Sequence, residues 1–232
     1  MKNGTIQWDT LIVDITDEVR QQQVNETLVQ EIHHRVKNNL AIIIGFLELQ
    51  LEDLNEQSPE RLTLERAMTR IYSIAEIHKL LHEGSNLVDI NVKKYMDHLI
   101  EHITDTINVG DGLHVDLQVD RLQMNVNELT PLGMLLSELL TNSAKYALNR
   151  NKRGHIQINI SSLNGSYNVR YHDTGPGIDK LEFENPKDTD FNIVHLLLRQ
   201  LEADYKLLNK DGFGLEFTFK ERQKGAHSNI GI

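Results

Sequence analysis

The strongest constraint on the fold is a set of apolar residues spaced by three and four near the start of the chain. This spacing indicates one buried stripe on an α-helix, because helical residues three and four apart lie on the same face. It predicts a helix from about Glu18 to Asp53, and a similar pattern predicts a second helix from about Glu60 to His82. The first stripe consists of Val24, Leu28, Ile32, Val36, Leu40, Ile43, Leu47, Leu51 and Leu54.

A short turn separates the two predicted helices, with Ser58 placed as an N-cap and Pro59 at the first helical position. Two long helices joined by a short turn form an antiparallel hairpin. One hairpin has too small a core of its own, so we expect two copies to pair into a four-helix bundle. The sequence therefore predicts a homodimer formed through residues 19–84.

From Asn86 the pattern changes to a mixture of strands and helices, which predicts an α/β sandwich after the hairpin. The expected fold class is thus multidomain, α followed by α+β. Thr130-Pro131 is an alternative start for the helix expected at 127–148. The expected elements are helices at 92–107, 127–148 and 192–202, strands at 113–119, 205–208 and 215–220, and a β-hairpin of 155–163 with 167–172 around Asn164-Gly165.

The two ends of the chain lie outside these units. Residues 1–18 contain an alternating β-branched segment, which predicts a strand. This segment resembles the exit of a PAS sensor domain, and an independent N-terminal arm is an equal alternative. Residues 223–232 are expected to be a disordered tail. The predicted domains are therefore 1–18, 19–84, 85–222 and 223–232.

Composition excludes several classes of function. The 232-residue chain has a formal net charge of −10, which disfavours general binding to nucleic acid or anionic membranes. It has no cysteine, so disulfides and thiolate metal sites are excluded. It has no apolar run of about 18 residues that would predict a membrane span. We expect a soluble, cytoplasmic protein without a transmembrane segment.

His34 lies on the polar face of the first predicted helix. At about 100° per residue it falls opposite the apolar stripe, whereas His33 falls much nearer to it. Glu31, Lys37 and Asn38 are three or four residues from His34 and share its face. An exposed imidazole with a carboxylate one turn away can be kept neutral and oriented as a nucleophile. The alternative is that His34 is one of eleven histidines on a solvated helix.

The segment EIHHRVKNNLAIIIGFLELQ, which begins at Glu31, resembles the H box of sensor histidine kinases whose phosphoacceptor motif is His-Arg-Val-Lys-Asn. In that family the histidine directly before the arginine is phosphorylated, and this is His34 here. The resemblance therefore implies that His34 is the phosphoacceptor, with Glu31 as a catalytic neighbour. The helical geometry selects the same histidine independently.

A second polar stripe lies in the helix predicted around residue 138. Glu138, Asn142 and Lys145 are spaced by four and three, and Tyr146 follows directly. An amide oxygen can bind a hard cation and lysine can bind phosphate, but such a stripe alone is more often a solvated face. The segment ELLTNSAKYA resembles the N box of the Bergerat-type ATPase domain that histidine kinases share with gyrase and Hsp90 chaperones. The resemblance implies that Glu138 and Asn142 bind Mg²⁺, with Glu138 also catalytic, and that Asn142, Lys145 and Tyr146 contact ATP.

The loop YHDTGPGI, residues 171–178, follows a predicted strand. It resembles the first glycine box of the same ATPase domain, in which the aspartate accepts a hydrogen bond from the adenine amino group. This implies that Asp173 binds adenine, while Gly175 and Gly177 let the backbone pass close to the base. A turn of this composition alone is more often an ordinary loop.

The resemblance is weaker further along the chain. The second glycine box of the family is replaced by Asp188-Thr189-Asp190-Phe191. A helix start there would normally present backbone N–H groups to phosphate, and Asp190 adds a repelling negative charge. Gly212-Phe213-Gly214 resembles the last glycine box, although a hairpin turn explains it equally well.

Taken together, the motifs resemble the core of a sensor histidine kinase over roughly residues 20–220. The resemblance implies that His34 is phosphorylated from ATP with Mg²⁺, and that the phosphoryl group passes to an aspartate of a response regulator. The altered second glycine box supports an alternative, a phosphotransfer or scaffold protein whose ATPase-like domain has degenerated.

Overall fold

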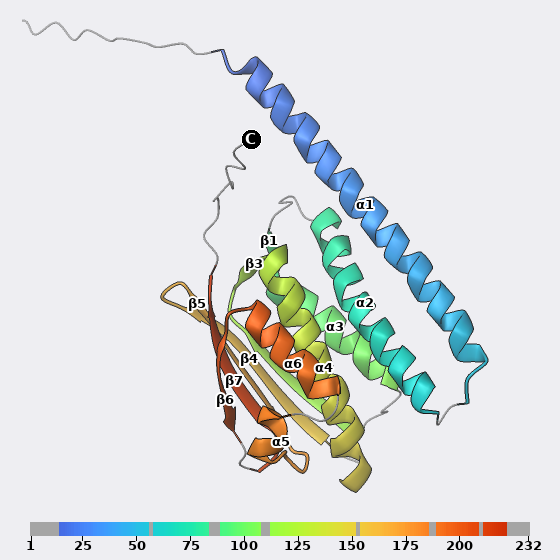
Figure 1. Ribbon diagram of the computed structural model, residues 1–232. Helices are drawn as coiled ribbons and strands as arrows, with labels where there is room; N and C mark the ends of the chain where they lie inside the picture. The colour runs from blue at the N-terminus through green and yellow to red at the C-terminus, as the bar shows by residue number, and fades with distance from the viewer. Residues whose placement is uncertain are drawn as a thin grey trace, which may run out of the picture.

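The computed structural model describes residues 14–55, 58–83, 89–107, 112–151, 154–185, 189–208 and 211–221. Its first part is a long helical hairpin of α1 (Thr16–Glu52) and α2 (Pro59–Glu83), followed by an α/β domain (Figure 1). The predicted fold class is confirmed in this arrangement of a helical region and an α/β ATPase-like sheet. The strand expected within residues 1–18 falls largely outside the described residues, and Thr16 already belongs to α1.

The hairpin turn is built as its residues predict. The Ser58 hydroxyl oxygen accepts a hydrogen bond from the backbone N–H of Arg61 at 3.1 Å, which caps the start of α2. The Arg61 side chain then donates to the backbone carbonyl of Leu51 at 2.9 Å, near the end of α1. These two contacts fix how the chain leaves α1 and enters α2.

The second hairpin helix lies between the first helix and the α/β domain. It packs against α1 on one side and against α3 and α4 on the other (Figure 1). Ile77, Leu80 and Leu81 of α2 are buried in the main core. The later part of the apolar side of α2 is therefore covered within the same chain, whereas Leu62 near the start of α2 is 37% exposed.

A five-stranded sheet forms the base of the α/β domain, in the order β2-β4-β5-β7-β6. β2 runs parallel to β4, and the other neighbours are antiparallel. A separate two-stranded sheet, which the sequence pattern did not reveal, pairs β1 with β3. The bounds are β1 Asp89–Asn91, β2 Leu113–Val119, β3 Gln123–Asn125, β4 Gly154–Leu163, β5 Ser166–Asp173, β6 Asp204–Leu208 and β7 Gly214–Lys220.

The predicted β-hairpin is present as β4 and β5. Its turn residues Asn164 and Gly165 both have positive φ, 53° and 73°. Two positive φ values are typical of the tight turn that joins antiparallel strands, and glycine adopts them at low cost. The expected position of the turn is therefore confirmed.

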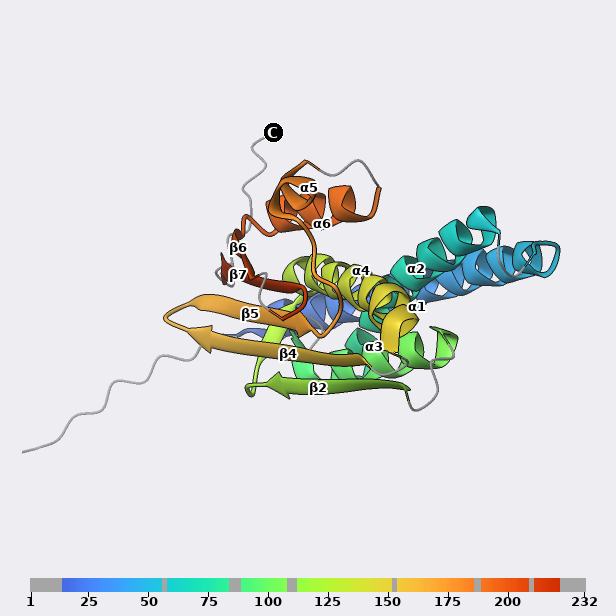
Figure 2. The same ribbon diagram turned by 90° about the horizontal axis from the view of Figure 1, so that it is seen from below.

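The helices of the α/β domain lie on one face of the five-stranded sheet (Figure 2). α4 starts at Val126, so Pro131 lies inside this helix and does not mark its start. Alternate residues of β4 and β5 are buried beneath the helices, including Ile156, Ile158 and Tyr171. The helices are α3 (Val92–Ile107), α4 (Val126–Asn151), α5 (Lys180–Glu184) and α6 (Thr189–Gln200).

Candidate functional site

The two adjacent histidines of α1 have different surroundings. Nδ1 of His33 lies 2.8 Å from Nδ1 of His78 on α2, and the two ring centroids are 5.1 Å apart. Burial lowers the pKa of His33, and burial together with the neighbouring His33 lowers the pKa of His78. His33 thus lies in the seam between the hairpin helices. His34 is half-buried, one residue further around α1.

The carboxylate that shares the face of His34 has a partner of its own. Oε1 of Glu31 accepts a hydrogen bond from Nε of Arg35 at 2.7 Å, and both side chains are exposed. An exposed ion pair one helical turn apart contributes little to stability, because water screens it. Glu31 can therefore exchange partners at small cost, and its assistance to His34 stays a prediction.

Helix α4 carries the residues predicted to bind metal and phosphate. Asn142 is only 6% exposed, and its Nδ2 has no hydrogen-bond partner among the described residues. An unpaired buried amide is costly, so such a group commonly marks a place where a ligand or water completes the bonding. This observation fits a ligand at Asn142. The side chains of Lys145 and Tyr146 lie outside the part that the structure describes.

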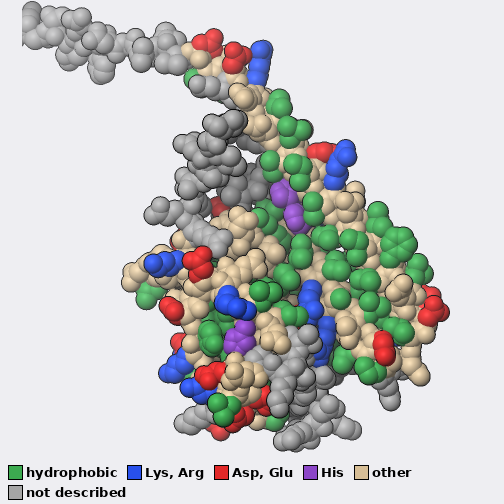
Figure 3. All heavy atoms as spheres, in the orientation of Figure 1, with side chains coloured by type: hydrophobic (Ala, Val, Ile, Leu, Met, Phe, Trp, Pro, Cys, Tyr) green, Lys and Arg blue, Asp and Glu red, His purple; other side chains and the backbone are tan. Residues whose placement is uncertain are grey.

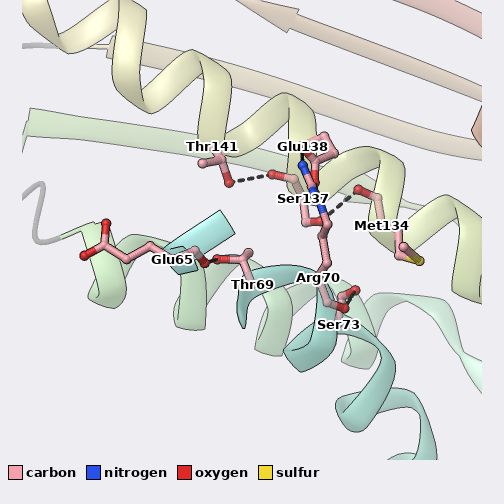
Figure 4. A network of polar contacts seen from close by, with 8 residues as sticks. All are labelled: Glu65, Thr69, Arg70, Ser73, Met134, Ser137, Glu138 and Thr141. Atoms are coloured by element: carbon pink, nitrogen blue, oxygen red, sulfur yellow. Dashed lines mark hydrogen bonds and ion pairs between the residues drawn. The ribbon is translucent and has the colours of Figure 1, made fainter. Parts of the chain in front are cut away.

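Glu138, one turn before Asn142, faces the hairpin. Its two carboxylate oxygens accept hydrogen bonds from Nε and Nη2 of Arg70 on α2, the second at 2.9 Å (Figure 4). The Glu138 side chain is 5% exposed and that of Arg70 is 25% exposed. A fork of two bonds between guanidinium and carboxylate is strong and directional. In this conformation Arg70 therefore holds the carboxylate that the sequence analysis assigns to Mg²⁺.

Two hydroxyl side chains lie close to this ion pair. Ser73 of α2 donates its hydroxyl to the backbone carbonyl of Arg70 at 2.7 Å, and Ser137 donates to that of Met134 at 2.8 Å (Figure 4). Each of these hydroxyls therefore donates its hydrogen bond within its own helix. The direct polar link drawn between α2 and α4 in Figure 4 is the bond between Arg70 and Glu138.

Asp173 ends β5 and is buried. Its Oδ1 accepts hydrogen bonds from the backbone N–H of Gly175 at 2.8 Å and of Phe213 at 3.2 Å. Its Oδ2 accepts one from the hydroxyl of Ser143 on α4. Three donors fix the orientation of this carboxylate.

Ser143 is a site residue that the sequence analysis missed. Its oxygen also accepts a hydrogen bond from the Tyr171 hydroxyl at 2.7 Å, so Tyr171, Ser143 and Asp173 form a buried chain of donors. Burial raises the pKa of Tyr171 well above its ordinary value. The only sequence signal was position, because Ser143 directly follows Asn142. Through Ser143, α4 and the end of β5 are held together.

Glycines allow the surrounding loops to approach Asp173. Gly177 has a φ of 73° and Gly212 a φ of 135°, which favour glycine. A side chain at Gly212 would also clash with the carbonyl oxygen of Asp173. The segment that leads from β6 into β7 therefore packs against the Asp173 loop. Because β6 and β7 pair antiparallel, Gly212 and Gly214 can belong both to a hairpin turn and to a glycine box.

The segment that departs from the second glycine box is only partly described. α6 begins at Thr189, which places Asp190 in its first turn. Residues 186–188 and the side chains of Thr189 and Asp190 lie outside the described part. The predicted repulsion between Asp190 and phosphate therefore stays a prediction.

Comparison with protein families gives two matches along the chain. Residues 31–107 match HisKA_2, a histidine kinase family, and residues 127–223 match HATPase_c, the histidine kinase-, DNA gyrase B- and HSP90-like ATPase family. These matches support a sensor histidine kinase. The first match includes His34 and extends through α3, and the second includes Asn142 and Asp173.

Curated relatives point the same way. The sensor histidine kinase PdtaS of Mycobacterium tuberculosis is 26% identical over 208 residues, which are 87% of this chain and 40% of that protein. Blue-light-activated histidine kinase 2 of Erythrobacter litoralis is 26% identical over 213 residues, covering 87% of this chain and 56% of that protein. The chain thus spans about half or less of the length of these relatives.

A solved structure has the same fold. The histidine kinase domain of the Erythrobacter litoralis EL346 blue-light-activated histidine kinase matches with a TM-score of 0.62 and 20% identity, covering 84% of this chain and 93% of that one. Within the described part of the chain, no helix has the length and apolar character needed to cross a membrane.

Proposed function

We propose that this chain is the catalytic core of a sensor histidine kinase of the His-Arg-Val-Lys-Asn subfamily. An imidazole nitrogen of His34 attacks the γ-phosphorus of ATP, the bond between that phosphorus and the β,γ-bridging oxygen breaks, and ADP leaves. The imidazole gives up its ring proton to solvent. The phosphoryl group then passes to an aspartate of a response regulator. Such transfer depends on positioning and charge neutralisation more than on covalent help from the protein.

One observation supports this proposal above the others. Asn142 and Ser143 are neighbours on α4, and Ser143 donates a hydrogen bond to Asp173 at the end of β5. Two motifs about 30 residues apart thereby meet in one place. The unpaired Nδ2 of Asn142 is beside this junction in the sequence and is buried. The junction supplies an anionic acceptor for adenine and an amide for the metal and phosphates.

The roles follow from the chemistry of each group. Asp173 accepts a hydrogen bond from the adenine amino group, and its two oxygens are already oriented by protein donors. Asn142 and Glu138 hold Mg²⁺, and Lys145 and Tyr146 contact the nucleotide. When bound, Mg²⁺ neutralises phosphate charge. Gly175 and Gly177 shape the loop beneath the base.

A change of conformation is part of this proposal. Glu138 is paired with Arg70, so it becomes available to the metal only when the contact between α2 and α4 opens. The same opening would release the hairpin to bring His34 to the nucleotide. Motions of this kind often set the rate of an enzyme. We therefore infer that the Arg70–Glu138 pair holds a resting arrangement.

The exposed side of α1 supports self-association. Apolar residues recur on it at helical spacing, and Phe46 is 66% exposed. Figure 3 shows hydrophobic side chains gathered over the side of the molecule where the hairpin lies. A large exposed apolar patch is typical of a protein interface. We propose a homodimer through α1, acting in the cytoplasm, and the residues concerned are Val24, Leu28, Val29, Ile32, Ile42, Ile43, Phe46 and Leu49.

An alternative has a specific observation in its favour. The sequence Asp188-Thr189-Asp190-Phe191 replaces the second glycine box, and an acidic residue at a helix start opposes phosphate. This would fit a phosphotransfer or scaffold protein with a degenerate ATPase-like domain. The two functions differ in whether the chain itself consumes ATP.

The test is incubation of the chain with γ-labelled ATP and Mg²⁺. The proposal predicts a protein-bound label that is acid-labile and alkali-stable, as expected for phosphohistidine, and that disappears when the metal is chelated. Calorimetric titration with ATP and ADP provides the companion measurement. Nucleotide binding without label contradicts autophosphorylation, and absence of both supports the phosphotransfer alternative.

A further inference from the structure

Three side chains of metal-binding type meet on the face of the sheet opposite the helices. His114 of β2 and His155 of β4 are register partners in a parallel strand pair, and Asp116 is two residues after His114. Residues two apart in a strand point to the same face, as do register partners. Neither the proposed kinase reaction nor the sequence motifs use any of these residues.

The ligand atoms of the three residues already face one another. Nε2 of His114 lies 3.0 Å from Oδ1 of Asp116, and Nε2 of His155 lies 2.8 Å from Oδ2 of Asp116. One candidate ligand atom from each residue lies within 4.8 Å of the other two. The two imidazole rings are stacked with centroids 5.4 Å apart. One ion can contact all three residues after only small side-chain rotations.

We propose that His114, Asp116 and His155 form a site for a divalent transition metal, with Zn²⁺ as the reference ion. Zinc binds histidine nitrogen and carboxylate oxygen at about 2.0–2.2 Å, so two of its ligand atoms lie at most about 4.4 Å apart. The three ligand atoms here lie within 4.8 Å of one another, so a small closing movement lets them share one ion. The ion takes the place of the protons that the imidazoles share with the carboxylate. Two imidazoles select zinc, copper or nickel over Mg²⁺ and Ca²⁺, which prefer oxygen ligands.

Exposure sets the character of this site. The side chains of His114 and Asp116 are 74% and 48% exposed, so water completes the coordination and exchange with solvent is open. A hydrogen-bonded His–Asp–His group without metal is the alternative. A closed structural zinc site would have four protein ligands. The site is therefore one of reversible uptake.

The location gives metal binding a structural consequence. β2 is an edge strand whose neighbour in the sheet is β4, so one ion would tie the two together. The backbone N–H of His155 donates to Oγ1 of Thr174 at 3.0 Å, and the N–H of Thr174 donates to the carbonyl of His155 at 3.1 Å. Thr174 lies between Asp173 and Gly175. The metal site is thus connected through His155 to Thr174 in the candidate nucleotide loop of residues 173–178.

Calorimetric titration of the full chain with zinc chloride, after chelator treatment and dialysis, tests the proposal. We expect one saturable site in the wild type. Loss of an outer-shell partner alone commonly weakens a metal site about 10- to 100-fold, so loss of a direct ligand in His114→Gln or His155→Gln should weaken this site at least as much. Asp116→Asn keeps the side-chain shape and should weaken it too.

The matched control is His172→Gln. His172 lies on the same face of the sheet, on β5, and pairs in register with Gln157 rather than with a member of the cluster. This variant should keep the wild-type affinity for zinc. Circular dichroism of each variant verifies that the chain is folded.

Two results would overturn the site. Unchanged zinc affinity in the double variant His114→Gln/His155→Gln would assign the ion to other histidines. Displacement of zinc by equimolar Mg²⁺ or Ca²⁺ would contradict the nitrogen-rich ligand set. None of these measurements uses nucleotide, so failure of the metal site and failure of the kinase proposal are distinguishable.

Discussion

Helices α1 and α4 each carry a motif for phosphoryl transfer, but they are held in the molecule very differently. α1 packs mainly on α2, and apolar residues such as Ile32 and Phe46 stay exposed along it. α4 contacts α2, α3, α6 and β4, and its Glu138, Asn142 and Ser143 are buried. The proposed phosphoacceptor His34 is half-buried on a helix with few attachments, whereas α4 encloses its candidate site residues in packed structure.

This difference corresponds to two kinds of chemical task. A nucleotide site needs groups with fixed orientations, and Asp173 has three protein donors that fix it. A phosphoacceptor must meet first the nucleotide and then a partner protein, so it is better placed on a helix with few attachments. Mutations in α1 should therefore affect activity with little loss of stability, and mutations around α4 should affect both.

The largest expected effect is at His34, the proposed phosphoacceptor. His34→Gln should abolish the acid-labile label, because no other group on the polar face can take its place. The matched change His33→Gln should keep most of the label, since His33 is engaged with His78 in the hairpin seam. Circular dichroism and light scattering should give wild-type values for His34→Gln. Full labelling of His34→Gln, with loss in His33→Gln, would reverse the assignment.

The next effect is on nucleotide affinity. Asp173→Asn replaces an acceptor of three hydrogen bonds by a group that must turn an N–H₂ toward one of those donors. A buried hydrogen bond to a charged group is worth about 1.5–3 kcal/mol, so ATP binding should weaken about 10- to 100-fold. Calorimetry measures this. Asp204→Asn, at the exposed start of β6, is the control and should bind ATP as the wild type does.

The free energy of unfolding should depend on the Arg70–Glu138 pair, which links the helical hairpin to the α/β domain. Arg70→Ala leaves the Glu138 carboxylate buried without its charged partner, which should lower the free energy of unfolding by about 2–4 kcal/mol. The double variant Arg70→Met/Glu138→Leu should recover most of this loss, because it removes both charges. Urea titration measures both. Equal destabilisation by the two variants would show that packing of Arg70, rather than its charge, matters.

A smaller change concerns the exposed side of α1. Phe46→Asp places a charge on the apolar surface and should shift a dimer toward monomer, with little change in unfolding of the chain itself. Light scattering across a concentration series follows the shift. Gln50→Asp adds the same charge at an exposed polar position of α1 and should leave association as it is. A monomeric wild type at micromolar concentration would contradict the proposed interface.

The smallest effect is a pH dependence from the hairpin seam. Burial lowers the pKa values of His33 and His78 below the usual value of about 6.5. As pH falls, these histidines therefore take up protons in the unfolded chain before they do so in the folded chain. The stability that they contribute is fully present above the unfolded pKa and is lost as pH falls through the lower folded pKa. The double variant His33→Gln/His78→Gln should show a shallower fall in unfolding free energy between neutral and mildly acidic pH. Identical pH profiles would exclude these histidines as its source.

Several elements could be predicted from local pattern because local chemistry determines them. The spacing of apolar residues predicted α1 and α2, Ser58 predicted the cap of α2, and Asn164-Gly165 predicted the β4–β5 turn. The predicted helix start at Asn127 is close to the observed start at Val126, and only the alternative start at Thr130-Pro131 was wrong. The short strands β1 and β3 gave no signal, since three residues are too few to show a period.

The sequence by itself determined the longer helices and strands and the motifs they carry, whereas the tertiary structure decided the partners. Arg70 and Glu138 are 68 residues apart, His33 and His78 are 45, Asp116 and His155 are 39, and Ser143 and Asp173 are 30. Periodicity and capping act over a few residues, so they cannot report which distant side chains meet. Those pairings arise when elements pack, because burial of apolar faces fixes the geometry and the polar groups then bond to whatever lies opposite.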